Sequence, residues 1–528
     1  MKQKYLIFRT FNRVMNFSLI LRTVAYLKPV QLVFQMLNRV RKPRYITIEL
    51  SDCSVGNRLH TEPISKEPSL VCEEFTFLNI TQHFEGWNDI SNGTLYTYNQ
   101  NYFDFINSKG VSSEVACAWI DKFIQEIETI TWGMDPYPIA LRSINWMKYF
   151  SMHPETANHL RLNSLWSQIC HLQKKLEYHL LGNHLLEDAF ALYIGGCFFH
   201  DENLLKKGYK LLMEQLNEQI LNDGAHFEQS PMYHCVLLDR LLDCYNFSVS
   251  NAISGVEQSK MNDCLRSYAC KMLGHLAAIV YSNGDIPLLN DSANRISPTS
   301  NQLFDYAERL GIKWEKLDLK ESGYRHWVKD NWEAIIDVGN ISASYQPGHT
   351  HADTFNYELR KNNKPFIVDT GISTYEKNGR RQYERSTIAH NTVSINEADS
   401  SEVWGGFRVG GRATVKVYEE SDEYISASHN GFPGVKCNRE FINDINGFIV
   451  RETLDKHVGA KSYIHLAPGI QVIEFSSSKV LTSFGVIEIQ NAAKVDVIDE
   501  LVSKEYNQLI PIKKVVISFI EKMQYIVK

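Results

Sequence analysis

The stretch from Glu333 to Gly371, EAIIDVGNISASYQPGHTHADTFNYELRKNNKPFIVDTG, marks the point where the sequence changes from one kind of structure to another. It opens and closes with short apolar runs rich in β-branched residues, which are typical of strands. Between these runs lie Pro347 and Gly348, followed by two histidines one residue apart. The stretch therefore predicts the start of a β-rich region that also carries titratable side chains.

On the N-terminal side of this stretch the pattern is helical. From about residue 75 to about residue 320, apolar residues recur at three- and four-residue spacing, and short breaks rich in Gly, Pro and Asn separate the segments. This pattern predicts a stack of helical hairpins. Examples are EVACAWIDKFIQEIETI (114–130), LLKKGYKLLMEQLNEQIL (204–221) and YHCVLLDRLLDCYNFSV (233–249).

On the C-terminal side, β-branched and polar residues alternate, as in HNTVSIN (390–396) and GFIVRETLD (447–455). This pattern favours an antiparallel β-sandwich. We therefore predict a multidomain α+β protein with a basic helical segment over residues 1–50, a helical domain over 51–325 and a β-sandwich over 326–528. Because ligands often bind where domains meet, we expect the chemistry at the junction.

The composition supports a folded protein of more than one domain. The chain has 528 residues, of which 44% are hydrophobic and 22% are charged, so it can bury large cores. The net charge is -6 and the isoelectric point is near 6.3. Proteins that follow a phosphate backbone need a basic surface, so we expect no nucleic-acid partner.

The N-terminal segment is basic and rich in apolar residues. Its first acidic residue is Glu49, and Arg9, Arg13 and Arg22 interrupt the apolar runs before they reach the length of a signal peptide or a membrane span. The segment could lie on an anionic membrane surface or dock on a biosynthetic complex, and equally it could form helices packed on the main domain.

The location of the protein follows from this segment and from the cysteines. No cleaved signal is visible, and the ten cysteines include no CxxC pair, which favours a reducing compartment. We expect a cytoplasmic protein, or one held peripherally at the inner membrane of a bacterium. A periplasmic location stays open.

The two histidines of the opening stretch raise a geometric question. On a strand, His349, His351 and Asp353 would point to the same face. A polar strand face without a metal is the more common explanation for such a pair. His351, Asp369 and His390 are nevertheless the residue types of a zinc site, with Asp353 as a rival carboxylate.

Two further polar pairs stand at predicted helix starts. Asn183 and His184 open an apolar helix, where they either face a cleft or cap the helix. Tyr233 and His234 follow a loop rich in Gly and Pro. Tyr233 could transfer a proton, although packing is the more common role of a tyrosine at a helix start.

Several motifs together resemble the heparinase II/III-like family of polysaccharide lyases. The resemblance covers the chain from about residue 80 to its end, and the set is far more specific than any single motif. For the fold, it implies an incomplete (α/α) toroid joined to an antiparallel β-sandwich, with substrate between them. The motifs are NHLLEDAFAL (183–192), DGAHFEQSPMYH (223–234), GDIPLLNDS (284–292), GHTHADTFNYEL (348–359), VDTG (368–371), RSTIAHNTV (385–393) and SSEVWGGFRVGGRA (400–413).

The chemistry that the resemblance implies is β-elimination at a uronic acid. Asn183 would neutralise the substrate carboxylate, while Tyr233 and His349 would act as proton donor and base, in roles that the sequence does not separate. The resemblance also divides the histidine pair, because His349 would face the substrate. His351 would bind a structural divalent metal, expected to be Zn²⁺, together with Asp369 and His390.

The remaining assignments concern substrate binding. We assign His184, His234 and Arg408 to this role, although an ion pair at the surface or between domains is the more common explanation for a residue such as Arg408. Trp87, Tyr96 and Trp146 could stack on sugar rings or belong to the helical core, and they are left out of the site.

The leading hypothesis is a lyase that cleaves an acidic polysaccharide and leaves a 4,5-unsaturated uronate end. The expected substrate is a bacterial surface polysaccharide or exopolysaccharide, with glycosaminoglycan or alginate as alternatives. A glycoside hydrolase on the same scaffold would need two carboxylates, for which Glu228 and Asp285 are candidates. A non-catalytic factor in glycan assembly is the third possibility.

Overall fold

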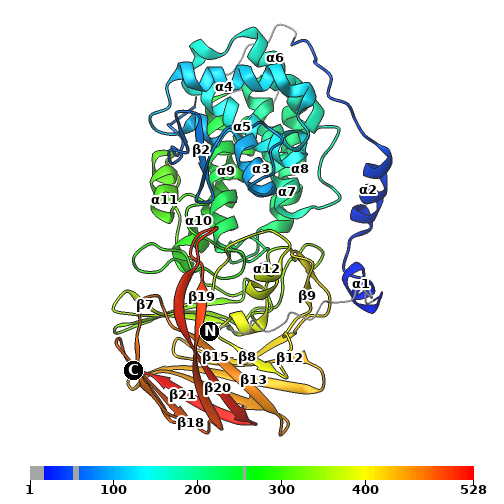
Figure 1. Ribbon diagram of the computed structural model, residues 1–528. Coiled ribbons are helices and arrows are strands. Elements are labelled where there is room, and N and C mark those ends of the chain that lie inside the picture. Colours follow the sequence, from blue (N-terminus) through cyan, green and yellow to red (C-terminus); the bar gives the residue numbers. More distant parts are fainter. Residues whose placement is uncertain (1–16, 51–58, 252, 254–256) are drawn as a thin grey trace.

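The computed structural model describes residues 17–50, 59–251, 253 and 257–528. Its two large parts differ in kind, with helices gathered at the top of Figure 1 and strands at the bottom. The predicted fold class, an incomplete (α/α) toroid followed by an antiparallel β-sandwich, is confirmed.

The helical domain is built around α7, which is buried on nearly all sides because most of its residues are apolar. It packs closely on α8 where Gly196 faces the backbone of Leu205. A Cβ at Gly196 would lie 2.4 Å from the Leu205 Cα, so only glycine permits this approach. The helices are α3 (Thr94–Tyr102), α4 (Ser113–Glu126), α5 (Pro136–Met152), α6 (His159–Leu172), α7 (Gly182–Phe198), α8 (Glu202–Gln219), α9 (Pro231–Ser250), α10 (Gln258–Ile279) and α11 (Ser300–Arg309).

A small antiparallel sheet belongs to the helical domain. Strands β1 (Leu70–Val71), β2 (Glu74–Phe77) and β3 (Ile80–His83) form it in that order. Its buried Phe75 packs edge-on against Trp119 of α4, with the ring centroids 5.0 Å apart. The sheet therefore belongs to the core of the helical domain.

The largest sheet of the β-sandwich has eight antiparallel strands. Its strands alternate between buried and partly buried residues, as in β13, so that one face meets the other sheets. In spatial order they are β11 (Val415–Glu420), β12 (Tyr424–Phe432), β13 (Val435–Asp444), β14 (Gly447–Leu454), β21 (Lys522–Val527), β18 (Val486–Gln490), β17 (Lys479–Thr482) and β16 (Val472–Phe475).

Two four-stranded sheets and a short hairpin complete this domain. Apolar residues of both four-stranded sheets share one core with the eight-stranded sheet. The first has the order β4 (Tyr324–Lys329), β5 (Trp332–Asp337), β6 (Tyr357–Lys361) and β7 (Lys364–Ile367). The second has the order β19 (Lys494–Val502), β20 (Ile510–Ile520), β15 (Gly459–His465) and β8 (Val393–Ile395), and the hairpin pairs β9 (Val403–Trp404) with β10 (Arg408–Val409).

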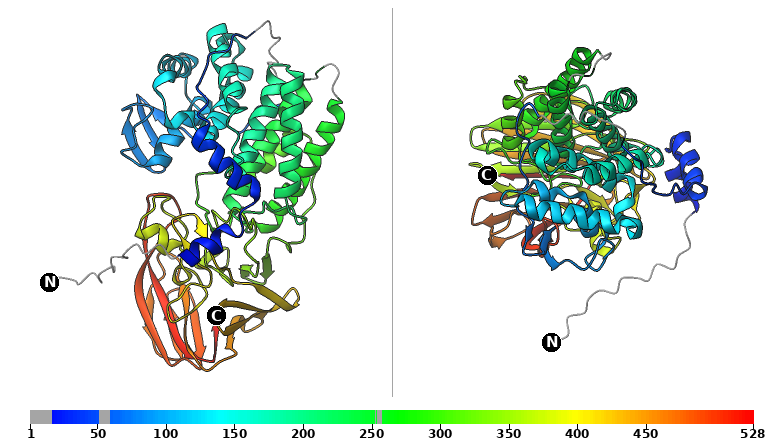
Figure 2. Two further views of the ribbon diagram at one scale, coloured as in Figure 1. Left: turned by 90° about the vertical axis from the view of Figure 1, so that its right-hand side faces the viewer. Right: turned by 90° about the horizontal axis from the view of Figure 1, so that it is seen from above.

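The N-terminal segment forms an arm outside both domains. Helices α1 (Phe17–Val24) and α2 (Pro29–Val40) run across the gap between the helices and the strands, as the left view of Figure 2 shows. No single described helix is long and apolar enough to span a membrane. Helices α1 and α2, bent by 111° relative to each other, meet that length and composition only as a pair. Residues 1–16 of the predicted segment lie outside the described residues.

The predicted strand around the two histidines is wrong. The chain from 338 to 356 is a loop between β5 and β6, and its residues belong to no β-sheet. The His349 carbonyl accepts from the Asp291 amide at 3.1 Å, and the His351 amide donates to Asn290 Oδ1 at 3.0 Å. Hydrogen bonds to the segment after α10 therefore take the place of the strand-to-strand hydrogen bonds that the alternating pattern predicted.

The last helix of the helical domain and the first strand of the sandwich are joined by a short segment. Helix α11 ends at Arg309 and β4 begins at Tyr324, and residue 326, where we place the division between the domains, lies in β4.

Candidate active site

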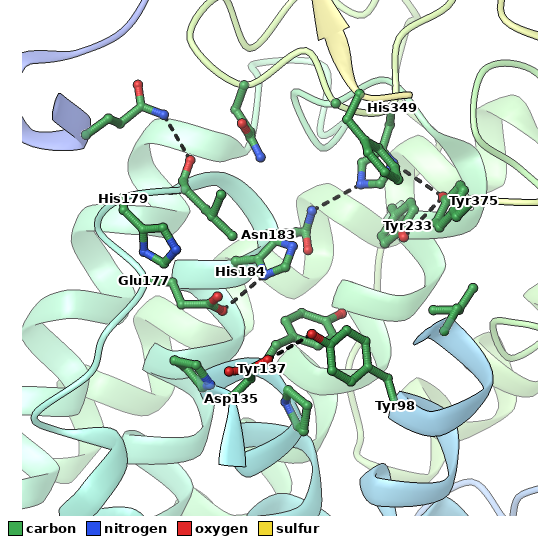
Figure 3. A pocket seen from close by; sticks show the side chains of 18 of the residues that line it. Tyr98, Asp135, Tyr137, Glu177, His179, Asn183, His184, Tyr233, His349 and Tyr375 are labelled. Atoms are coloured by element: carbon green, nitrogen blue, oxygen red, sulfur yellow. Dashed lines mark hydrogen bonds and ion pairs between the residues drawn. The ribbon is translucent and has the colours of Figure 1, made fainter. Parts of the chain in front are cut away.

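One large cleft lies where the two domains and the arm meet. Its volume is about 1170 Å³. Figure 3 shows its lining side chains, with Asn183, Tyr233 and His349 close together. The starts of α7 and α9 and the loop before β6 deliver these three residues, although they are far apart in the sequence.

Asn183 lies in the first turn of α7, where a carboxylate holds its side chain. Leu181 and Gly182 before it have φ values of 63° and 58°. A Cβ at Gly182 would lie 2.4 Å from Glu228 Oε1, so glycine lets the backbone approach this carboxylate. Asn183 then donates to Glu228 twice, from its backbone N at 2.9 Å and from Nδ2 at 2.8 Å. Its Nδ2 also lies 3.3 Å from His349 Nε2.

Tyr233 lies in the first turn of α9. Pro231 is the first residue of this helix, and the Ser230 hydroxyl caps it by accepting from the Tyr233 amide at 3.2 Å. The Tyr233 ring stacks on His349 with centroids 3.9 Å apart, and Tyr375 donates to its hydroxyl at 3.2 Å. Burial raises the pKa of Tyr233 above its ordinary value, so this hydroxyl is protonated at neutral pH.

The imidazole of His349 lies between two carboxylates. Its Nδ1 is 2.9 Å from Asp291 Oδ2, and its Nε2 is 3.3 Å from Glu228 Oε2. We assign the hydrogen of the neutral ring to Nδ1, because Asp291 can only accept there when it is ionised. This leaves the Nε2 lone pair on the side of Asn183, where it can take up a proton.

Asp291 is the centre of a buried charge network that joins the two domains. It lies in the segment after α10 and forms two hydrogen bonds with Arg381 of α12 (Gly379–Glu384), at 2.5 and 2.7 Å. Its Oδ1 also lies 2.8 Å from His351 Nε2. Burial by itself raises the pKa of Asp291, but Arg381, His349 and His351 together lower it well below the usual range. Asp291 is therefore ionised and sets the orientation of His349.

His184 and Arg408 line the cleft as predicted residues of a binding surface. His184 Nδ1 is 3.0 Å from Glu177 Oε2, and its ring lies 4.7 Å from that of Tyr137. Burial opposes the charged imidazole, but Glu177 outweighs it and raises the pKa of His184. The guanidinium of Arg408 is exposed and lies over the ring of Trp404, and it forms no ion pair with any described residue.

His234 does not belong to this cleft, which corrects its predicted role in substrate binding. It is 2% exposed, and its side chain points into the helical domain. Its Nε2 donates to the carbonyl of Met272 at 3.0 Å, and its Nδ1 accepts from the His226 amide. The helical period explains the difference, because adjacent residues in the first turn of α9 point about 100° apart. Trp87, Tyr96 and Trp146 are likewise buried in the helical core.

The three predicted metal ligands lie together behind the cleft. His390 Nδ1 is 2.7 Å from Asp369 Oδ2, and the rings of His351 and His390 are 5.2 Å apart. Within the described chain, no group of three or more His, Cys, Asp or Glu is arranged to hold a metal ion. His351 Nδ1 and His390 Nε2 are nevertheless buried and have no hydrogen-bond partner among the described residues. The donor types suit Zn²⁺, although Asp369 here bonds to His390.

The sequence analysis missed three residues of the site and gave a fourth another role. Asp291 lies in a motif that was recognised, but nothing in the sequence pairs it with His349. Arg381 and Tyr375 lie in a stretch that carries no motif. Glu228 was considered only for hydrolysis. The one available signal was a charged residue next to an apolar run, as at Asp291, and this signal is common in any protein.

The assembled groups suit proton transfer. Tyr233 presents a protonated hydroxyl, and His349 presents a lone pair that an ionised carboxylate supports from behind. Asn183 supplies an amide N–H group at the same place. Such a set can remove a proton, deliver a proton and stabilise a developing negative charge.

Two domain models of one family match most of the chain. The model described as heparinase II/III N-terminus matches residues 139–310, and the model described as heparinase II/III-like, C-terminal, matches residues 312–525. Heparin-sulfate lyase of Bacteroides thetaiotaomicron is 24% identical over 350 residues, which are 58% of this chain and 48% of that protein. Heparin-sulfate lyase of Pedobacter heparinus is 25% identical over 263 residues, which are 44% and 38%. The matches thus span less than half of either relative.

Solved structures share the fold. A heparinase III crystal structure superposes with a TM-score of 0.64 at 16% identity, covering 82% of this chain and 76% of that chain. Heparan sulfate lyase HepC from Pedobacter heparinus gives a TM-score of 0.53 at 15% identity, covering 94% and 87%.

Proposed function

Because the chain belongs to the heparinase II/III-like family, we propose that it is a polysaccharide lyase that cleaves a uronate-containing chain by β-elimination. The observation that carries the proposal is the stack of Tyr233 on His349, with the Asn183 amide 3.3 Å from the same imidazole. The names of the curated relatives agree with this activity.

The reaction begins with loss of the proton at C5 of the uronate. This proton is weakly acidic while the neighbouring carboxylate keeps its full charge, so a hydrogen-bond donor must stabilise the enolate that forms. We assign this donor to the Nδ2 hydrogen of Asn183 that faces His349 Nε2, because the other Nδ2 hydrogen bonds to Glu228 Oε2. His184 lies beside Asn183 at the cleft surface. Glu228 fixes the amide from behind.

Two groups then complete the elimination. His349 Nε2 takes the C5 proton, the electron pair forms the C4–C5 double bond, and the C4–O4 bond breaks. The protonated hydroxyl of Tyr233 delivers a proton to the departing O4, and burial, which raises the pKa of Tyr233, keeps this hydroxyl protonated until then. The products are one fragment with a 4,5-unsaturated uronate at its new non-reducing end and one fragment with a new reducing end, which keeps the former O4 as its anomeric hydroxyl.

The hydrolase alternative has little support from the site. Glu228 is engaged by Asn183, and Asp285 bonds to Arg360 and Asn283 away from the large cleft. An inverting or retaining hydrolase needs two carboxyl groups on either side of one bond.

The substrate that we propose is an acidic bacterial surface polysaccharide or exopolysaccharide. The relatives named for heparin sulfate make that glycosaminoglycan the first alternative, followed by alginate. Each carries the uronate that the mechanism needs.

The deciding experiment follows absorbance near about 232 nm while the protein is incubated with a panel of these polysaccharides. We expect a rise with one substrate, and we expect Tyr233→Phe and His349→Ala to lower the rate about a hundredfold or more. Arg39→Ala, on the outer side of the arm, is the matched control. New reducing ends without absorbance would instead indicate hydrolysis, and binding without either signal would indicate an assembly factor.

We also propose that His351, Asp369 and His390 hold a structural divalent cation, with Zn²⁺ as the candidate. The two unpartnered ring nitrogens of His351 and His390 support this. The cation would supply rigidity behind His349, because His351 shares the Asp291 carboxylate with it. Metal analysis should find one equivalent per chain, reduced in His390→Ala, and a metal-free purified protein would contradict the proposal.

For location we propose peripheral attachment to the inner membrane of a bacterium. The outer side of the arm supports this, since Val33, Met36 and Val40 are exposed there alongside Arg39. The protein should sediment with vesicles of phosphatidylglycerol and phosphatidylcholine but not with phosphatidylcholine alone. Met36→Glu with Val40→Glu should weaken that binding, and equal binding by both proteins would reject this role of the arm.

A further inference from the structure

The arm is held against both domains at defined points. Arg22 of α1 forms two hydrogen bonds with Glu402 next to the β9–β10 hairpin, at 2.7 and 2.5 Å. Gln31 of α2 donates to the carbonyls of Leu180 and Tyr345, at 3.1 and 3.3 Å. The arm therefore bridges the sandwich and the toroid on one side of the cleft (Figure 2).

The inner side of the arm forms part of the cleft lining. Residues from both arm helices and from the extended chain after α2 face the same cavity as Tyr233 and His349. In Figure 3 the arm lies on the side of His179, and Tyr233, Tyr375 and His349 lie on the other. The arm is thus a wall of the cleft, across from the proposed reaction centre.

The acidic and the basic side chains that line the cleft differ in whether they have partners. All its acidic side chains in the described chain are engaged in hydrogen bonds. Their partners are Asn145 for Asp104, Tyr98 for Asp135, His184 for Glu177, and Lys66 for Asp239.

The basic residues at the arm differ from these acidic ones. Arg41 and Lys42 follow α2, and Lys174 follows α6 on the facing toroid loop. All three are exposed, line the cleft and form no ion pair with any described residue. Uncompensated positive charge in a cleft attracts and orients anions.

We propose that Arg41, Lys42 and Lys174 form an anion-binding subsite, the arm subsite, for a sugar of the polysaccharide that lies outside the reacting pair. Its ligand is a carboxylate or sulfate group on that sugar. Arginine suits this role because its planar guanidinium binds such groups in a bidentate manner. The inference rests on the proposed lyase function for the identity of the bound polymer, but the binding itself can be measured without catalysis.

The test compares two double variants that each remove two charges from the arm. Arg41→Ala with Lys42→Ala changes the arm subsite, and Arg39→Ala with Arg44→Ala changes exposed residues of the same arm that do not line the cleft. Each pair is also combined with Tyr233→Phe to prevent turnover. Binding of heparan sulfate and of alginate is then measured by calorimetry at low salt and at about 0.5 M salt.

We expect the subsite variant to weaken binding of the better polymer about tenfold at low salt, with a smaller effect at high salt and little effect from the control pair. In the catalytic background its KM for the polymer should rise by a similar factor while kcat stays within about twofold, because the subsite lies away from the reacting atoms. A disaccharide, too short to reach the arm, should show no difference.

Other outcomes separate the two proposals. The arm subsite would be overturned if the subsite variant bound the polymers as well as the protein with an unchanged arm, or if both double variants lost binding equally. It would also be overturned if the protein with an unchanged arm bound neither polymer. Loss of binding confined to the subsite variant, without any unsaturated product from the parent protein, would support the subsite and count against the lyase.

Discussion

Glu228 holds two of the proposed catalytic side chains at once. It accepts both hydrogen bonds from Asn183, and its Oε2 lies 3.3 Å from His349 Nε2. It does not line the cleft itself, so it acts through its neighbours as a positioning residue. Its negative charge also compensates an imidazolium once His349 has taken a proton.

The substitution Glu228→Gln tests this role. The glutamine amide can accept only one of the two hydrogen bonds from Asn183, and the substitution removes the negative charge that stabilises protonated His349. We expect kcat to fall between about tenfold and a hundredfold while polysaccharide binding by a Tyr233→Phe background stays unchanged. Glu315→Gln, at an exposed carboxylate, is the control. A loss of binding equal to the loss in kcat would show that Glu228 serves only the structure.

Helix α7 carries a buried charge that its apolar surroundings do not favour. Glu187 is fully buried in this helix, and neither of its carboxylate oxygens has a hydrogen-bond partner among the described residues. Arg240 lies 3.6 Å away and lowers the pKa of Glu187, but burial outweighs it and raises that pKa to about 7. The helix therefore prefers a neutral Glu187.

A pH titration of stability tests this preference. The pKa of Glu187 is higher in the folded protein than in the unfolded chain. Protonated Glu187 therefore contributes its full stabilisation below about pH 4, and this contribution is lost as the pH rises through 7. The free energy of unfolding of Glu187→Gln, relative to that of the parent protein, should therefore rise between pH 5 and pH 8 by up to about 3 kcal/mol. Chemical denaturation at each pH measures it, with Glu214→Gln as an exposed control. A pH-independent difference would contradict the assignment.

At the scale of the whole molecule, one buried ion pair couples the two domains. Asp291 comes from the helical domain and Arg381 from the sandwich domain, and both side chains are fully buried. The same carboxylate orients His349, so the site is assembled only when the domains are correctly docked. Stability and catalysis therefore depend on the same contact.

Replacing Arg381 with Met should show this dependence. The change removes the guanidinium from the buried Asp291 carboxylate and leaves only the two histidines as its partners. Losing the charged partner of a buried pair costs about 3–5 kcal/mol of unfolding free energy. Lys513→Ala, which breaks an exposed pair with Asp499, should cost less than about 1 kcal/mol. Denaturation in urea measures both, and equal small effects would mean that the pair between the domains does not stabilise the molecule.

The sequence alone determined the order and the kind of the domains. Apolar residues at helical spacing up to α11 and alternating residues from β4 onward are local patterns, and local patterns can be read without knowledge of the fold. The residue types at Asn183, Tyr233 and His349 were legible for the same reason, because each stands in a distinct motif.

Only the tertiary structure decided which partners these residues have. Hydrogen bonds between segments far apart in the chain bring Glu228, Asp291 and Arg381 into the site. His234 lies outside the site because its side chain points from α9 into the helical domain. The loop around His349 replaced a predicted strand because its backbone bonds to the segment after α10. Such contacts depend on how domains dock, which no local pattern records, and the same docking places the arm along the cleft.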